Sequence, residues 1–252
     1  MADQEDYILE AAALTKEFRG FIAVKNVDLK IRRGAIHALI GPNGAGKTTC
    51  FNLLTKFLTP SKGRIQFDGE DVTADAPPAI ARRGLVRSFQ ISATFANLTV
   101  LENVRIALQR KRGLATQFWL ESSVLETLNA PAMELLQSVN LAGLAKARAV
   151  ELPYGRKRAL ELAVTLALEP KMMLLDEPMA GMGHEDIARV TALIRKAAAG
   201  RTVLMVEHNL SVVSELCDRI TVLQHGEVIA EGPYGEVSAD PRVKEAYLGA
   251  AA

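Results

Sequence analysis

A glycine-rich stretch, GPNGAGKTT, combines three glycines with a lysine and two threonines. The glycines let the backbone curl so that its N–H groups point at an anion, and a helix N-terminus beyond adds partial positive charge. Lys47 is a point cation suited to the β- and γ-phosphates, and the Thr48 hydroxyl suits Mg²⁺. The pattern G-x-x-x-x-G-K-[ST] therefore predicts a nucleotide phosphate-binding loop made of Gly41, Pro42, Asn43, Gly44, Ala45, Gly46, Lys47, Thr48 and Thr49.

Two adjacent acids follow an apolar run in MMLLDEP, residues 172–178. If this strand neighbours the phosphate-binding loop, Asp176 arrives beside the phosphates and can hold Mg²⁺ through water. Glu177, one residue further on, can polarise an attacking water, as hydrolysis requires. The two stretches together predict a nucleoside triphosphatase.

Buried strands alternating with helices must position these groups. Short apolar runs bounded by glycines or polar residues predict the strands, and periodic apolar residues predict the helices. This alternation is typical of a mostly parallel α/β sheet, which places ligands at the carboxyl ends of its strands. The predicted strands are Ala35–Ile40, Met172–Leu175 and Thr202–Val206, with helices at Thr48–Leu58 and Glu185–Ala199.

Two other sections differ from this alternating core. Tyr7–Ala12 and Val24–Ile31 read as short strands of an opening antiparallel section, Arg64–Phe67 as another short strand, and Val222–Leu223 with Glu227–Ala230 as a closing hairpin. Strand signals thin out from about residue 75 to 165. Helical spacing predicts an insert there with helices at Val100–Gln109, Leu120–Asn129, Ala132–Val139 and Gly155–Leu168.

The composition is that of an ordinary globular protein. The 252 residues are 49% hydrophobic and 23% charged, with a net charge of +1 that offers no bulk attraction to nucleic acid. Cys50 and Cys217 are far apart and lack metal-site spacing, which fits a reducing compartment. The N-terminus has no signal-peptide pattern, and no stretch approaches the roughly 18–20 apolar residues of a membrane span.

A third stretch, LPYGR at residues 152–156, starts a helical pattern just ahead of the strand that ends in Asp176 and Glu177. With the phosphate-binding loop, the helical insert and a later strand ending at His208, the chain resembles the nucleotide-binding subunit of ABC transporters from about Tyr7 to Leu248. The family's signature, Leu-Ser-Gly-Gly-Gln, corresponds to this stretch. The resemblance implies that Gly155 faces ATP bound to another subunit, while Pro153 removes the usual serine hydroxyl and an N–H.

The resemblance assigns further roles residue by residue. It implies that Gln90 reaches Mg²⁺ and senses the membrane partner, that His208 contacts the γ-phosphate, and that Phe18 stacks on adenine. Gly183 stands where the family's dimer-contact loop carries Asp or Asn, so a polar cross-dimer contact is lost. The cluster at residues 156–158 reads as a solvated basic helix face, with Arg156 a second candidate for phosphate.

The expected fold is a P-loop NTPase α/β core with an N-terminal antiparallel β section and a helical subdomain insert. We expect one ABC nucleotide-binding domain over 1–252, with core segments 1–84 and 166–232, the helical subdomain at 85–165 and a docking tail at 233–252. The resemblance implies catalytic Glu177, His208 and Lys47, and a Mg²⁺ site formed by Thr48, Gln90 and Asp176. It implies ATP and Mg²⁺ as cofactors.

The implied partners are a similar ATPase subunit, as homodimer or heterodimer, membrane permease subunits and, indirectly, a periplasmic solute-binding protein, with no nucleic acid. The expected location is cytoplasmic, peripheral on the inner membrane. The Tyr-Gly signature, RSFQISATFANLTVLENV and the ending KEAYLG resemble the branched-chain and hydrophobic amino acid uptake group. Alternatives are lipid or lipopolysaccharide extraction, a soluble ABC ATPase acting on DNA or ribosomes, and a low-activity nucleotide-binding regulator.

Overall fold

The computed structural model describes residues 6–88, 94–111 and 125–248, and its contacts divide the chain into two compact units. The first unit contains Met1–Arg87, Lys171–Glu177 and Ala198–Ala252. The second contains Ser88–Pro170 and Pro178–Ala197. Each unit is described by itself below.

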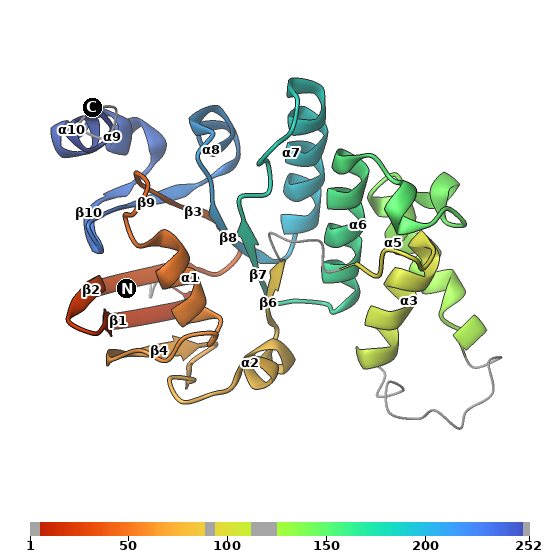
Figure 1. Cartoon of the computed structure of the whole chain (residues 1–252), viewed down its shortest axis with the longest axis horizontal. Helices are drawn as coiled ribbons and strands as arrows, with labels where there is room; N and C mark the ends of the chain where they lie inside the picture. Colours follow the sequence, from red (N-terminus) through yellow and green to blue (C-terminus); the bar gives the residue numbers. More distant parts are fainter. Residues whose placement is uncertain (1–5, 89–93, 112–124, 249–252) are drawn as a thin grey trace, which may run out of the picture. The chain divides into compact units, whose positions relative to one another are not determined.

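A six-stranded, mostly parallel sheet is the centre of the first unit (Figure 1). Its order is β10-β9-β3-β8-β7-β6, and β3 pairs in parallel with both β8 and β9, while β10 is antiparallel to β9. Every residue of β3, β7 and β8 is buried, as their continuous apolar runs predict. The strands are β3 Ile36–Ile40, β6 Leu85–Ser88, β7 Met172–Asp176, β8 Thr202–Val206, β9 Arg219–Gln224 and β10 Glu227–Gly232.

Strand β6 departs from the sequence prediction, which began the helical insert at residue 85. Leu85–Ser88 instead forms the edge strand of the parallel sheet, beside β7. The reason is non-local, because the N–H groups of Lys171 and Met172 both donate to the carbonyl of Gly84, just before β6. Four residues carry too little local pattern to predict a strand whose stability comes from a distant partner.

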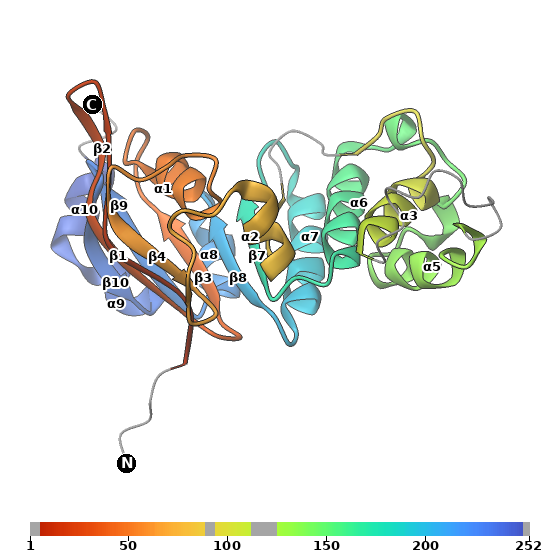
Figure 2. The same cartoon turned by 90° about the horizontal axis from the view of Figure 1, so that it is seen from below.

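A second sheet, antiparallel with order β2-β1-β4-β5, confirms the predicted N-terminal β section (Figure 2). Its strands are longer than expected, because β1 and β2 extend toward one another into a hairpin that ends with Phe18 opposite Phe21. Apolar residues of both sheets and of helix α1 form one buried core. The elements are β1 Tyr7–Phe18, β2 Phe21–Arg32, β4 Lys62–Phe67, β5 Glu70–Asp71 and α1 Lys47–Leu54.

Helix α1 is shorter than the predicted Thr48–Leu58. It stops at Leu54 because Lys56 adopts a left-handed backbone with φ 65°. The described part of this unit has four further helices: α2 Pro77–Arg83, α8 Leu210–Leu216, α9 Tyr234–Ala239 and α10 Pro241–Leu248. Helices α9 and α10 pack against β10 and against each other, so the C-terminal part of the chain docks on the core sheet.

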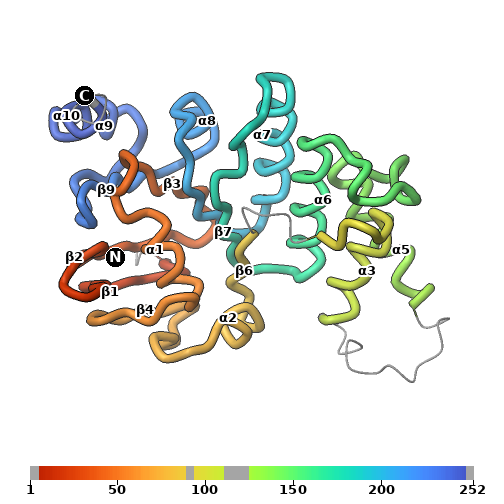
Figure 3. Tube along the Cα trace, viewed as in Figure 1, coloured from red at the N-terminus to blue at the C-terminus, as the bar shows by residue number. Residues whose placement is uncertain are grey.

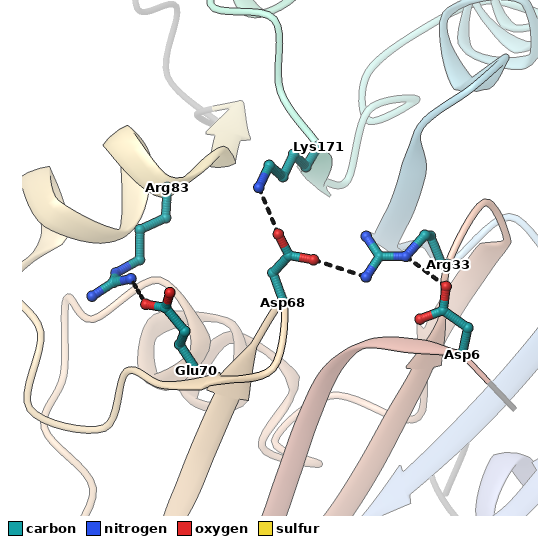
Figure 4. A network of polar contacts seen from close by, with 6 residues as sticks. All are labelled: Asp6, Arg33, Asp68, Glu70, Arg83 and Lys171. Carbon is teal, nitrogen blue, oxygen red and sulfur yellow. Dashed lines mark hydrogen bonds and ion pairs between the residues drawn. The ribbon is translucent and has the colours of Figure 1, made fainter. Parts of the chain in front are cut away.

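An ion-pair network joins the two sheets at the ends where β3 and β7 begin (Figure 4). Asp68, in the turn after β4, lies 2.8 Å from Arg33 and 2.5 Å from Lys171, which directly precedes β7. Arg33 also pairs with Asp6 at 2.8 Å. The side chains are partly exposed, so screening by water keeps their contribution to stability small.

The second unit is helical, and α3, α5 and α6 pack against one another (Figure 3). Thr99 and Glu102 form a capping box at the start of α3, since the Thr99 N–H donates to the Glu102 carboxylate and the Glu102 N–H to the Thr99 hydroxyl. Half of the predicted helix Leu120–Asn129 lies outside the described residues. The elements are α3 Val100–Lys111, α5 Asn129–Ser138, 3₁₀ turns Ala142–Leu144 and Ala149–Glu151, α6 Tyr154–Ala167 and α7 His184–Ala198.

None of the described helices is both long enough and apolar enough to cross a membrane.

Candidate functional site

The glycine-rich loop connects the carboxyl end of β3 to helix α1, as predicted. Gly44 and Gly46 have left-handed φ values of 77° and 96°. A Cβ on Gly46 would lie 2.6 Å from the carbonyl oxygen of Ala23, and one on Gly41 would lie 2.1 Å from that of Leu223. The loop thus has its curled form because these positions lack a side chain, which leaves its N–H groups free to turn toward an anion.

Lys47 folds back over this loop. Its ammonium donates to the carbonyl oxygens of Gly41 at 2.7 Å and Pro42 at 2.8 Å, and the residue is only 6% exposed. Burial lowers the pKa of Lys47, and the negative charge of Glu177 partly offsets this effect. The ammonium therefore lies in a poorly solvated place, where an incoming phosphate would gain a strong electrostatic partner.

The strand order brings the predicted catalytic groups to the same edge as the phosphate-binding loop. Strand β8 lies between β3 and β7, so the residues after these three strands all lie at their carboxyl ends. Glu177 follows β7 with a left-handed φ of 47°, and its Oε1 lies 2.9 Å from Nε2 of His208, which follows β8. The Glu177 N–H also donates to Val206, the last residue of β8.

Strain at Glu177 supports a functional role, because a non-glycine residue in this backbone region costs free energy that its surroundings must offset. A cavity of about 870 Å³ opens beside the loop and is lined on one side by Gly41, Pro42 and Asn43 and on another by His208. Tyr247 of α10 also lines it. The cavity therefore borders both the first residues of the loop and His208.

The metal-binding role of Thr48 and Asp176 stays a prediction, and the oxygen atoms of both side chains suit it. Asp176 ends β7 and is 3% exposed, and Thr48 lies exposed in the first turn of α1. Among the described residues no cluster of three or more His, Cys, Asp or Glu could hold a metal by itself. A site with one carboxylate and one hydroxyl suits Mg²⁺, which keeps several waters and takes its other oxygens from substrate phosphates.

Sequence reasoning missed one residue at this site, Arg87. Its Nη2 lies 2.5 Å from Oδ2 of Asp176, and its Nη1 lies 2.5 Å from Oδ1 of Asn52 on α1. The pairing depends on β6 lying beside β7, so a prediction that assigned residue 85 onward to a helical insert had no means to find it. The only sequence signal was a basic residue three positions before Gln90.

Of two other residues predicted to contact the nucleotide or its metal, the structure describes one. Phe18 lies at the end of β1 and is 41% exposed, so part of its ring is open to a ligand. The ammonium of Lys16 lies over the ring, 5.1 Å from its centroid. The contact of Phe18 with adenine stays a prediction. Gln90 lies outside the described residues.

In the second unit, the signature stretch starts helix α6. Pro153 precedes the first helical residue, Tyr154, and its carbonyl accepts from the N–H groups of residues 156 and 157. A Cβ on Gly155 would lie 2.7 Å from the carboxyl group of Asp186 in α7, so the close approach of this side chain requires glycine or a shift of Asp186. The contact of Gly155 with a nucleotide of another subunit stays a prediction.

The expectation of a solvated basic face at residues 156–158 is wrong for Arg158. Its side chain is 8% exposed and pairs with Glu161, 7% exposed, at 2.8 Å, while its Nη2 donates to the Tyr154 hydroxyl. Arg156 donates to the carbonyl of Asn140. The error arose because consecutive helical residues point about 100° apart, so a run of three basic residues does not share one face, and α6 is covered on nearly all sides.

The fold and site define a P-loop nucleotide-binding protein. Two family profiles match the sequence: "ABC transporter" over residues 24–180 and "Branched-chain amino acid ATP-binding cassette transporter" over residues 227–252. The chain therefore belongs to the ABC transporter ATP-binding family, and it is an ATPase of that type.

Similar curated proteins carry related names. The chain is 38% identical to the high-affinity branched-chain amino acid transport ATP-binding protein BraF of Pseudomonas aeruginosa, over 97% of this chain and 98% of the relative. It is 35% identical to the corresponding protein LivG of Escherichia coli K12, with the same coverage. A crystal structure of the ADP conformation of an ATP-binding cassette of an ABC transporter superposes with a TM-score of 0.83, at 30% identity, over 96% of this chain and 99% of that one.

Proposed function

We propose that this chain is the ATP-hydrolysing subunit of an importer for branched-chain amino acids or a closely related small solute. The observation that carries the hydrolytic part is the placement of Glu177 and His208, 2.9 Å apart, at the same sheet edge as the phosphate-binding loop. Support for the substrate class comes from the names of the relatives and from the profile matched by residues 227–252.

In this proposal the loop of residues 41–49 binds the ATP phosphates through its N–H groups and Lys47. Mg²⁺, held through Asp176 and Thr48 with Gln90, would supply charge neutralisation of the β- and γ-phosphates. Glu177 orients the attacking water and accepts its proton at a carboxylate oxygen. His208 donates Nε2–H to Glu177 in the nucleotide-free form and is placed to donate to a γ-phosphate oxygen once ATP is bound.

Coupling to transport requires a second ATPase subunit, identical or similar, that presents its Gly155 to the nucleotide. The chain also needs a surface for the permease. Phe95 and Val150, 55% and 47% exposed, supply apolar area in the second unit, and the Val150 N–H donates to the carbonyl of Ala96 next to Phe95. Asn103 holds Phe95 through bonds to its N–H and carbonyl. We place this apolar pair at the permease contact.

The chain would then act at the cytoplasmic face of the inner membrane, bound through the permease subunits, with a periplasmic solute-binding protein as an indirect partner. We propose that the chain divides by function into a core, a helical subdomain that ends near residue 165 and a tail at 233–252, with the start of the helical subdomain moved past strand β6, Leu85–Ser88.

An uptake experiment tests the substrate class. Cells that lack the gene for this chain should lose uptake of radiolabelled leucine, isoleucine or valine, while lysine uptake serves as the control. Wild-type chain should restore uptake and the Glu177→Gln variant should not. Unchanged uptake of all three amino acids in the deletion strain would rule out this substrate class, and loss of lysine uptake as well would point to a general defect.

A further inference from the structure

The ion pair between Arg87 and Asp176 connects the metal-binding carboxylate to the strand that leads out of the first unit. Asp176 is 3% exposed and the Arg87 side chain 12% exposed, so the pair is shielded from water. A buried carboxylate without a counter-charge is costly. Arg87 supplies that charge, at 2.5 Å.

Arg87 is held by groups that do not depend on Asp176. Its guanidinium lies 5.9 Å from the ring centroids of both Phe51 and Phe57, and Nη1 donates to Asn52. Its Nε is buried with no hydrogen-bond partner among the described residues. The cation therefore has a separate site, between two aromatic rings and an amide, that it can keep when the carboxylate turns away.

A metal bound with ATP needs the same Asp176 oxygens and repels a nearby guanidinium. We propose that Arg87 is a positioning residue that holds Asp176 as an ion pair while no metal–nucleotide is bound, and releases that carboxylate when the metal arrives. Arg87 thereby sets the metal affinity of the site. The inference rests on the proposed metal role of Asp176.

The test uses the full chain in the Glu177→Gln background, so that ATP is retained, with Mn²⁺ as the probe metal. Arg87→Met removes the charge and keeps the length of the side chain. We expect its Mn²⁺ half-saturation concentration with ATP to fall about tenfold, because no cation competes for Asp176. We also expect its melting temperature to drop by several degrees in EDTA and by much less with Mg²⁺ and ATP. The matched control is Arg83→Met, which removes an exposed arginine of α2 that pairs with Glu70 and Asp75. It should change neither the Mn²⁺ half-saturation concentration nor the melting temperature.

An unchanged or higher half-saturation concentration in Arg87→Met would overturn the proposal, as would an equal loss of melting temperature with and without metal–ATP. If Arg87→Met does not fold, Arg87→Lys keeps the charge but loses the two-point contact, and should tighten Mn²⁺ binding by a smaller factor. Asp176→Asn separates the two hypotheses. If it binds Mn²⁺–ATP like the parent, the metal role of Asp176 is wrong; if it loses binding while Arg87→Met binds like the parent, only the role of Arg87 is wrong.

Discussion

Nε2 of His208 and Oε1 of Glu177 lie 2.9 Å apart, although the two residues follow different strands of the parallel sheet. The adjacent pairing of β7 with β8 creates this contact, with Asp176 opposite Val206 in register. The carboxylate that we propose as the general base is therefore itself oriented by the imidazole of His208. Such pre-organisation reduces the free-energy cost of reaching a reactive geometry.

Glu177→Gln should retain ATP binding and lose hydrolysis. The amide keeps the size and a hydrogen bond to His208 but cannot accept a proton from water. We expect the hydrolysis rate to fall by about 10²- to 10³-fold, as when a general base is removed. Sedimentation of the variant should show a dimer with ATP and a monomer without it. A variant that hydrolyses ATP at the parent rate would exclude Glu177 as the base.

His208→Ala should remove the imidazole contact of Glu177 and leave its carboxylate chemically intact. Because the carboxylate can still accept a proton, we expect a smaller loss of hydrolysis, about 10-fold or more, with the affinity for ATP reduced less than the rate. Steady-state kinetics and nucleotide binding measured on the same preparation separate the two effects. His184→Ala, at the exposed start of α7, is the control and should behave like the parent. Parent-like kinetics in His208→Ala would argue against a role for the pair.

The buried pair of Arg158 and Glu161 should show strong coupling in stability. Glu161→Leu removes the carboxylate that pairs with the buried Arg158, and Arg158→Met removes the cation that pairs with the buried Glu161. Each variant should lower the free energy of unfolding by about 3 kcal/mol or more. The double variant should lose much less than the sum, because it removes both charges. Calorimetric melting of the four proteins measures this coupling. Additive losses would mean that the pair contributes nothing as a pair.

His37 in β3 should make the first unit sensitive to mild acid. Burial, with a further contribution from the charge of Arg219, lowers the pKa of His37 from 6.5 to about 3. In the unfolded chain, His37 binds a proton below about pH 6.5, whereas in the folded chain it stays neutral down to about pH 3. Stability from this group is complete above pH 6.5 and falls with decreasing pH, by at most about 1.4 kcal/mol per pH unit.

Replacing His37 with glutamine should flatten this dependence. Glutamine can keep a neutral hydrogen bond to Thr221, whose hydroxyl lies 2.8 Å from Nε2 of His37. Melting temperatures of the parent and His37→Gln between pH 4 and 8 test the prediction, with His184→Gln as an exposed control. Parallel curves for parent and His37→Gln would show that another group carries the acid sensitivity.

Local motifs predicted the candidate phosphate-binding and catalytic residues. The loop of residues 41–49 and the acids 176–177 were found because their chemistry needs particular residue types at fixed, short spacing. Strands β3, β7 and β8 were found for a related reason, since burial on both faces demands continuous apolar runs. Each of these motifs and strands is specified by residues close together in the sequence and needs no distant partner to be recognised.

Contacts between distant segments were not predictable in this way. Strand β6 is a strand because it pairs with β7, and Arg87 meets Asp176 only through that pairing. Arg158 looked like a surface cation in a basic run, yet the packing of α6 buries it against Glu161.

The sequence by itself determined which chemical groups are candidates to bind a nucleotide and that an α/β core presents them. Only the tertiary structure decided which of those groups meet: His208 with Glu177, and Arg87 with Asp176. The physical reason is that motif chemistry depends on neighbours along the chain, whereas the pairing of buried charges depends on strand order and on the free energy of excluding water from them.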